Sequence, residues 1–143
     1  MLANKMDAED VMQEAFVSAF RKIADYRREA SFGAWLRRIV LNHCINFLQR
    51  KKTFFESLDD ENVAIAEDFR EHVAYAFPPE LIHKSVKMLP EGSRVILNLY
   101  LFEGYKHREI AEMLDISEST SKSQYQRAKK LLKEKLIRHE QQV

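Results

Sequence analysis

The spacing of apolar residues predicts a chain built from helices. Between residues 7 and 25 apolar side chains recur about every 3.6 residues, as on one face of a helix. The same period returns between residues 32 and 48, after Ser31, a residue type that caps helix N-termini. The expected inward positions are Ala8, Val11, Met12, Ala15, Phe16, Ala19, Phe20 and Ile23 in the first helix, and Phe32, Trp35, Leu36, Ile39, Val40, Cys44, Phe47 and Leu48 in the second.

The pattern changes in the middle of the chain. Residues 53–79 are acidic, lack a sustained period and close on two prolines, which is typical of a linker with room for a short helix. Periodic segments return at 80–89, which stops at Pro90, and at 91–103, which ends at Gly104. With the two helices described next, the second half should form a compact four-helix unit.

Residues 106–130 predict two helices joined by a tight turn. In the first, Ile110, Ala111 and Leu114 fall at helical spacing, and the small Ala111 lets a second helix cross closely. Asp115 then begins the turn, and Ser117 can cap the helix that follows. This layout is typical of a helix-turn-helix that binds duplex DNA.

The second of these helices has two different faces. One face, expected to pack inward, carries Ser121, Tyr125, Ala128 and Leu132, and the other carries Ser119, Lys122, Ser123, Gln126 and Arg127. Lys and Arg neutralise phosphates or donate to guanine, Gln pairs with adenine, and Ser contacts either base. A basic helix that is merely solvated is the alternative. The turn directly before the helix favours DNA binding.

Charge is distributed unevenly along the 143 residues. The net charge is only +1, yet residues 1–52 hold 10 Lys/Arg against 6 Asp/Glu, residues 53–79 hold 1 against 7, and residues 80–143 hold 12 against 9. Two basic blocks therefore flank an acidic connector, which favours a nucleic-acid partner. With 45% hydrophobic residues, 3 Gly and 3 Pro, the chain should be all-α and form one or two small domains.

Several chemistries have no candidate residues in this sequence. The single cysteine, Cys44, excludes an internal disulfide and leaves no ligand set for a structural metal, and the five histidines are scattered. We find no Gly-rich phosphate loop and no nucleophile–base arrangement. No signal peptide and no run of about 18 apolar residues is present. We therefore expect a soluble cytoplasmic protein that is not an enzyme, has no catalytic residues, cofactor or metal, and has no membrane partner.

Two blocks of the sequence carry a family resemblance. Residues 7–52, which begin DAEDVMQEAF, resemble region two of bacterial RNA polymerase sigma factors of the extracytoplasmic-function (ECF) type. Residues 89–132, which begin LPEGSRVILN, resemble region four of the same proteins. The resemblance implies two small helical domains, 1–52 and 80–143, joined by an acidic linker over 53–79. Family members carry a further helix before the first block, so we also expect exposed apolar surface here. We expect the N-terminal half to be partly disordered, to pair with a second copy in a homo-oligomer, or to pair with the C-terminal half.

The resemblance implies roles for individual residues. Asn42 matches a position that reads a flipped base of the minus-ten promoter element, and Thr120 lies near the backbone of the minus-thirty-five element. For Trp35 and Phe32 we favour core packing over base stacking, because both lie on the apolar stripe. The other contacts implied are Arg37, Arg38, Arg50, Lys51 and Lys52 with minus-ten phosphates, Lys122, Ser123, Gln126 and Arg127 with the minus-thirty-five element, and Asp10, Gln13, Glu14 and Arg21 with the polymerase.

Three positions depart from the usual family pattern. Ser121 replaces a Val, Gln124 replaces an Arg, and Asp115 replaces the Gly of the turn. Asp tolerates the left-handed backbone of such a turn better than most residues do. The promoter sequence therefore cannot be transferred from better-known members.

Three classes of function remain in view. The resemblance favours a sigma factor whose partners are promoter DNA, core RNA polymerase and an anti-sigma factor. The alternatives are a dimeric helix-turn-helix regulator that binds duplex DNA without core polymerase, and a helical adaptor that binds only protein. Two blocks in the order and spacing of the family are more specific than a lone helix-turn-helix.

Overall fold

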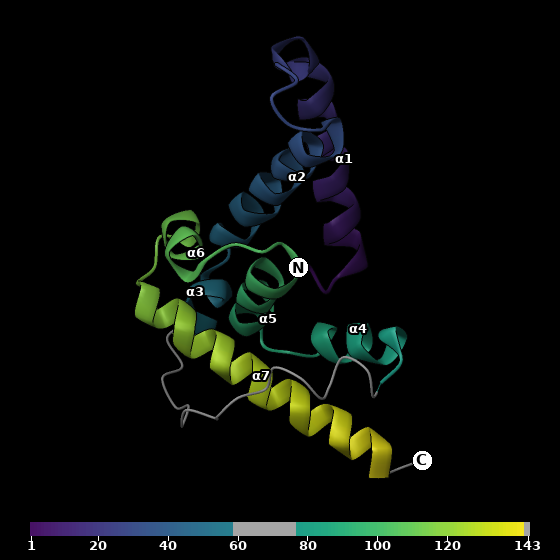
Figure 1. Ribbon diagram of the computed structural model, residues 1–143, viewed down its shortest axis with the longest axis vertical. Helices are drawn as coiled ribbons and strands as arrows, with labels where there is room; N and C mark the ends of the chain where they lie inside the picture. Colours follow the sequence, from purple (N-terminus) through teal and green to yellow (C-terminus); the bar gives the residue numbers. More distant parts are fainter. Residues whose placement is uncertain (59–76, 142–143) are drawn as a thin grey trace. The chain divides into compact units, whose positions relative to one another are not determined.

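The computed structural model describes residues 1–58 and 77–141, and every regular element in that part of the chain is helical (Figure 1). This agrees with the predicted all-α class. The elements in chain order are α1 (Lys5–Lys22), η1 (Ile23–Asp25), α2 (Phe32–Gln49), α3 (Lys52–Leu58), α4 (Pro79–Lys87), α5 (Glu91–Leu97), η2 (Asn98–Phe102), α6 (His107–Leu114) and α7 (Glu118–Gln141). They form two compact units, an N-terminal unit of Leu2–Lys51 and a C-terminal unit of Lys52–Val143 together with Met1.

The N-terminal unit is a pair of packed helices, α1 and α2. Each helix begins at a side-chain cap: the Asn4 Oδ1 accepts from the Asp7 amide at 3.1 Å, and the Ser31 Oγ accepts from the Ala34 amide at 3.2 Å. Such caps satisfy backbone donors that lack a partner within the helix. The cap predicted at Ser31 is therefore confirmed.

The buried stripe of the N-terminal unit is narrower than the sequence pattern predicted. The buried residues are Val11, Ala15 and Ala19 of α1 and Leu41, Ile45 and Leu48 of α2. Met12, Phe16 and Ile23 are exposed, and Phe20 is 74% exposed, so their predicted core placement was wrong. Leu41 and Ile45 are buried although they were not among the predicted positions. The physical reason is that one neighbouring helix covers only a narrow part of each apolar face.

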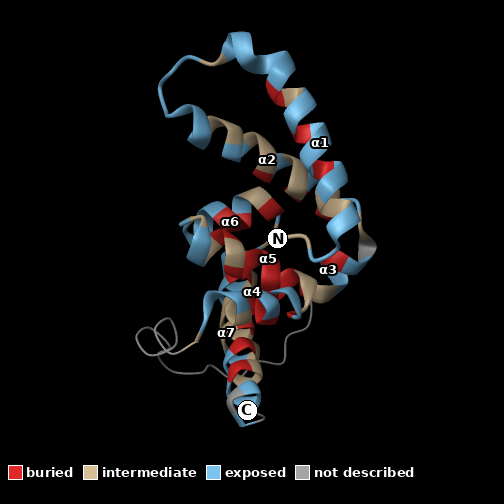
Figure 2. Ribbon diagram, turned by 90° about the vertical axis from the view of Figure 1, so that its right-hand side faces the viewer, coloured by how far each residue is buried: buried red, intermediate tan, exposed pale blue. Residues whose placement is uncertain are grey.

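The C-terminal unit has its core around α5. Figure 2 shows the buried residues of this helix and of α7. They include Val95, Ile96, Leu97 and Leu99 near α5, Ile110 and Leu114 on α6, and Ala128, Leu132 and Leu136 on α7. The turn between α4 and α5 is held by Arg94, which is buried and donates to the carbonyls of Lys87 (3.3 Å) and Leu89 (2.8 Å).

The segment predicted as one helix over 91–103 changes character at Asn98. Residues 98–102 form a single π-helical turn, η2, where the Asn98 Nδ2 donates to the Arg94 carbonyl at 2.7 Å. Such wider turns interrupt the α-helical ladder locally. Gly104 then adopts a φ of 78°, a left-handed backbone that glycine accepts without steric cost and that ends the helix as predicted.

The first residues of the predicted linker belong to the C-terminal unit. Residues 53–58 lie in α3, and Phe54 and Leu58 of this helix are buried. α3 packs against α5. The remainder of the predicted linker that precedes Phe77 lies outside the described residues.

Candidate nucleic-acid interface

The predicted helix-turn-helix is present as α6, a three-residue turn and α7. Asp115 adopts φ 56° and ψ 50°, the left-handed conformation that the sequence required of it. The Ile116 amide then donates to the Ala111 carbonyl at 3.0 Å. The Ser117 Oγ accepts from the Thr120 amide at 2.9 Å, which confirms the predicted cap of α7.

The outward face of α7 is only partly the face that the sequence predicted. Lys122 and Ser123 are exposed, whereas Gln126 and Arg127 are half-buried. Thr120 is half-buried as well, and its hydroxyl bonds to the Ser117 hydroxyl at 2.8 Å. The most accessible candidate contacts therefore lie in the first two turns of α7, the part of a recognition helix that meets base edges in helix-turn-helix proteins.

Lys122 is paired with an acidic neighbour. Its Nζ lies 2.7 Å from the Glu118 Oε1, one helical turn earlier. The hydrogen bond from Lys122 and its positive charge lower the pKa of the Glu118 carboxyl. A phosphate that binds Lys122 must therefore compete with Glu118 for the ammonium group.

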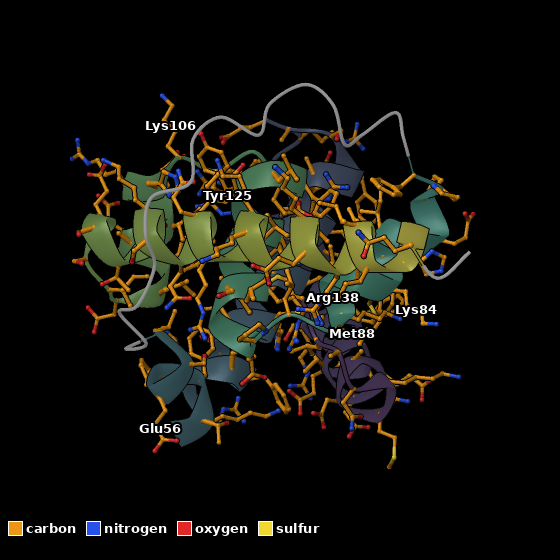
Figure 3. The ribbon with its side chains drawn as sticks, turned by 90° about the horizontal axis from the view of Figure 1, so that it is seen from below. Glu56, Lys84, Met88, Lys106, Tyr125 and Arg138 are labelled. Atoms are coloured by element: carbon orange, nitrogen blue, oxygen red, sulfur yellow. The ribbon has the colours of Figure 1, made fainter. Side chains whose placement is uncertain are left out.

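A histidine supports α7 from the N-terminus of α6. The His107 Nδ1 lies 2.9 Å from the Ser121 Oγ, and the imidazole stacks on Tyr100 at a centroid distance of 4.4 Å. The ring of Tyr125 on α7, labelled in Figure 3, lies beside both: its centroid is 5.5 Å from that of His107 and 4.5 Å from that of Tyr100. In the sequence, His107 is one of five scattered histidines and carries no signal of this role. The available signal was Ser121, because a hydroxyl on a buried face requires a partner.

This environment gives His107 a pH-dependent effect on stability. Burial and then the nearby Lys122 lower the pKa of His107 below the usual histidine value of about 6.5. Neutral His107 therefore contributes fully to the stability of the folded chain above about pH 6.5. As the pH falls below this value, the unfolded chain binds a proton at His107 before the folded chain does, so the contribution is lost as the pH passes through the lower pKa of the folded state. We expect His107→Gln to flatten the decline of unfolding free energy below pH 6.5, measured by denaturant titration at several pH values.

The matched control is His139→Gln, which changes an exposed histidine on the same helix, α7, as Ser121 and Tyr125. This variant should keep the pH dependence of the unmodified chain. If the two variants gave the same pH profile, the contribution assigned to His107 would be refuted.

The residues implied in minus-ten binding lie along α2 and just after it. Asn42 and Arg38 are exposed and four residues apart, so they share one face, and Arg37 and Arg50 are exposed as well. Lys51 is half-buried: its Nζ bonds the Asp7 Oδ2 at 3.2 Å and lies 4.6 Å from the Phe47 ring centroid. Lys51 therefore links α1 to the end of α2. The side chain of Lys52 lies outside the described residues.

Three aromatic rings meet at the connection between α1 and α2. Tyr26 lies 5.7 Å from Phe32 and 5.3 Å from Trp35, and the latter two rings are 5.5 Å apart. Phe32 is 48% exposed, so the predicted core packing was wrong for this residue. The cluster forms an aromatic surface beside the basic side chains of α2.

The residues implied in polymerase binding form a polar stripe on α1. Asp10, Gln13, Glu14 and Arg21 are all exposed, and their spacing places them on one face of the helix. Next to this stripe, His43 of α2 bonds the Ser18 Oγ at 2.8 Å. Its Nδ1 lies 3.9 Å from the Glu14 Oε2. The stripe therefore adjoins the contact between the two helices.

Two further properties can be stated for the described part of the chain. No group of three or more His, Cys, Asp or Glu residues within 1–58 and 77–141 is placed to hold a metal ion. None of the helices described for this chain combines the length and the apolar character that crossing a membrane requires.

Comparison with known proteins matches both parts of the chain. The family model "Sigma-70 region 2" matches residues 1–54, and "Sigma-70, region 4" matches residues 80–132. The chain is 28% identical to the ECF RNA polymerase sigma-E factor of Haemophilus influenzae, over 93% of this chain and 76% of that protein. It is 26% identical to the sigma-E factor of Escherichia coli (91% and 74%) and 32% identical to the ECF sigma factor SigM of Mycobacterium tuberculosis (86% and 61%).

Proposed function

We propose that this chain, which belongs to the sigma-70 family as an ECF sigma factor, selects promoters for RNA polymerase by binding two DNA elements with its two helical units. The observation that carries the proposal is the presence of both family regions, in order, each with an exposed basic surface. A sigma factor supplies sequence selection and strand opening. The polymerisation chemistry belongs to the core enzyme, so this chain itself needs no catalytic residues.

The C-terminal unit binds the minus-thirty-five element in this proposal. The first turns of α7 enter the major groove, where Lys122 and Ser123 contact base edges and Thr120 contacts the backbone. Gln126 and Arg127, one turn further along, extend the same contact. The support for this placement is the exposure of Lys122 and Ser123 directly after the capped turn.

The N-terminal unit binds and opens the minus-ten element. Asn42 offers both a donor and an acceptor to an unpaired base, and exposed aromatic rings stack on such bases. The exposed Phe32 within the aromatic cluster supports this role. Arg37, Arg38 and Arg50 contact phosphates, and the family resemblance gives Lys52 the same role. Lys51 can join them only if its ammonium group leaves Asp7.

The polar stripe of α1 binds core polymerase. We expect the combined substitutions Asp10→Ala, Gln13→Ala and Glu14→Ala to weaken binding to core polymerase by at least about tenfold, because all three exposed side chains are removed from one contact face. Fluorescence anisotropy with labelled chain measures the affinity. Arg21 completes the stripe and is tested separately.

A matched control and a transcription assay complete this test. Glu112→Ala removes an exposed acid from the C-terminal unit and should leave the affinity unchanged. Run-off transcription with core polymerase and promoter DNA should depend on the chain. A footprint on palindromic duplex DNA without polymerase, together with no run-off product, would instead identify a dimeric regulator.

Two further partners belong to the proposal. The family implies an anti-sigma factor. A second copy of this chain is the other partner, because α1 leaves Met12, Phe16, Val17 and Phe20 exposed. Light scattering of the purified chain tests the homo-oligomer, and a monomeric mass at all concentrations would contradict it. In this proposal the two family regions occupy residues 1–52 and 80–143, and residues 53–79 join them.

A further inference from the structure

The buried face of α7 carries two polar residues among apolar ones. Ser121 is 0% exposed and Gln124 is 1% exposed, on the same helix as the buried Ala128 and Leu132. The two polar residues are three positions apart, so they share one face of the helix. A buried polar group without a hydrogen-bond partner destabilises the folded chain. Each of the two residues therefore requires a partner on a neighbouring element.

The partner of Ser121 is on α6. Its Oγ lies 2.9 Å from the His107 Nδ1. The His107 ring is itself held in place, because it stacks on Tyr100 of η2 at a centroid distance of 4.4 Å. The Ser121 hydroxyl therefore meets an imidazole whose position is set by elements other than α7.

The partners of Gln124 are on α5 and α3. Its Oε1 accepts from the Oγ of Ser93, a residue of α5 that is 0% exposed, at 2.7 Å. Its Nε2 donates to the carbonyls of Ser57 (3.2 Å) and Leu58 (2.9 Å) at the end of α3. Every polar atom of this amide therefore has a partner. Ser121 and Gln124 are called the anchor residues of α7 below.

Hydrogen bonds of this kind restrict the rotation of α7 about its own axis. Apolar contacts such as those of Leu132 are not directional, whereas a hydrogen bond works over a range of only about 0.5 Å in donor–acceptor distance. The side chains of a helix end about 5–6 Å from its axis, so a rotation of about 20° moves them by about 2 Å. Such a rotation would break the bonds of both anchor residues. The anchor residues therefore fix the rotation of α7 against α6 and α5.

The same rotation has a large effect on the exposed face of α7. Lys122 and Ser123 directly follow Ser121 and are exposed. In the proposed function, on which this step rests, both contact base edges through hydrogen bonds that are equally sensitive to distance. The attraction between lysines and phosphates extends over about 10 Å at 0.1 M salt, so a shift of about 2 Å changes it little. A rotated α7 would still bind DNA but would discriminate poorly between sequences.

We propose that the anchor residues Ser121 and Gln124, with their partners His107 and Ser93, are positioning residues that set the sequence discrimination of α7 without touching a base. A fully satisfied buried polar network specifies one packing arrangement, which is the property that base readout requires of a recognition helix. Both anchor residues are departures from the usual family pattern, in which Val and Arg stand at these positions. A Val at position 121 has no group that can bond His107.

A paired apolar replacement separates positioning from stability. In the full chain with His107→Phe and Ser121→Ala, the Phe ring can still stack on Tyr100 and neither partner is left unpaired, so the free energy of unfolding should change little. Fluorescence anisotropy at low ionic strength measures binding to two duplexes. One is the duplex that the unmodified chain selects from a randomised pool, and the other is a scrambled duplex of the same composition.

We expect the preference of the paired variant for the selected duplex to fall at least about tenfold, because base contacts are lost, while binding to the scrambled duplex is unchanged. An unchanged preference in the paired variant would overturn the inference. If the unmodified chain selected no sequence from the pool, the proposed function would fail, and the inference would fail with it.

Two substitutions of equal shape keep the test decisive if the paired variant does not fold. Ser121→Thr and Ser121→Val add the same bulk to a buried site, but only Thr keeps the hydroxyl that bonds His107. The Thr variant should therefore retain the preference for the selected duplex, and the Val variant should lose it. Equal preferences in the two variants would overturn the role of Ser121.

The second anchor residue is tested in the same way. Ser93→Ala combined with Gln124→Met replaces this polar pair by apolar groups of similar size and should also lower the preference at least about tenfold. The control is Leu132→Met, a volume-conserving change on the buried face of α7 that leaves both anchor residues intact and should keep the preference. A control that lost the preference to the same extent would mean that any change of packing suffices, which would overturn the inference.

Discussion

Replacing Lys122 by alanine is expected to weaken binding to the minus-thirty-five element by about 10- to 100-fold. The side chain is exposed in the first turns of α7, where a lysine can donate to a guanine edge, and such contacts contribute about 1–3 kcal/mol. Anisotropy on a duplex carrying this element, compared with scrambled duplex, measures the loss. Thermal unfolding of the variant should match that of the unmodified chain, because the side chain lies outside the core.

Glu118 provides a contrasting substitution one helical turn away. Glu118→Gln removes the carboxylate that competes for the Lys122 ammonium group and should therefore strengthen duplex binding. Lys130→Ala is the matched control, since it removes an exposed charge further along α7. It should reduce affinity slightly and equally for all sequences. If Lys130→Ala and Lys122→Ala had the same effect on specific and scrambled DNA, Lys122 would be a phosphate contact only.

Sequence alone predicted the elements whose signals are local. The helix-turn-helix was predicted because Ser117, Asp115 and the small Ala111 act within a few residues of one another. The period also located α1 and α2. It overestimated their core, because periodicity reports which side chains are apolar and not how many neighbours cover them.

The parts that sequence missed depend on residues far apart in the chain. The sequence left room for a short helix in the linker but did not place it, because the seven residues of α3 are too few to establish a period. The partner of α3, Gln124, lies 66 residues after Leu58. His107 likewise acquires its environment from Tyr100 and Ser121 only when α6 crosses α7. In both cases a polar residue on the buried face of α7, Ser121 or Gln124, was visible in the sequence. The hydrogen-bond partner of each residue could not be read from the sequence.

Truncation of Leu114 should be among the most destabilising single changes in the C-terminal unit. This residue is 0% exposed at the end of α6, immediately before the left-handed Asp115, so Leu114→Ala leaves a cavity where α6 meets its neighbours. We expect the unfolding free energy to fall by about 2–5 kcal/mol. Urea titration measures it, with Met88→Ala, which truncates a 62% exposed side chain, as the control. A loss below about 1 kcal/mol would mean that α6 is not held by this contact, and DNA binding by α7 would then not depend on it.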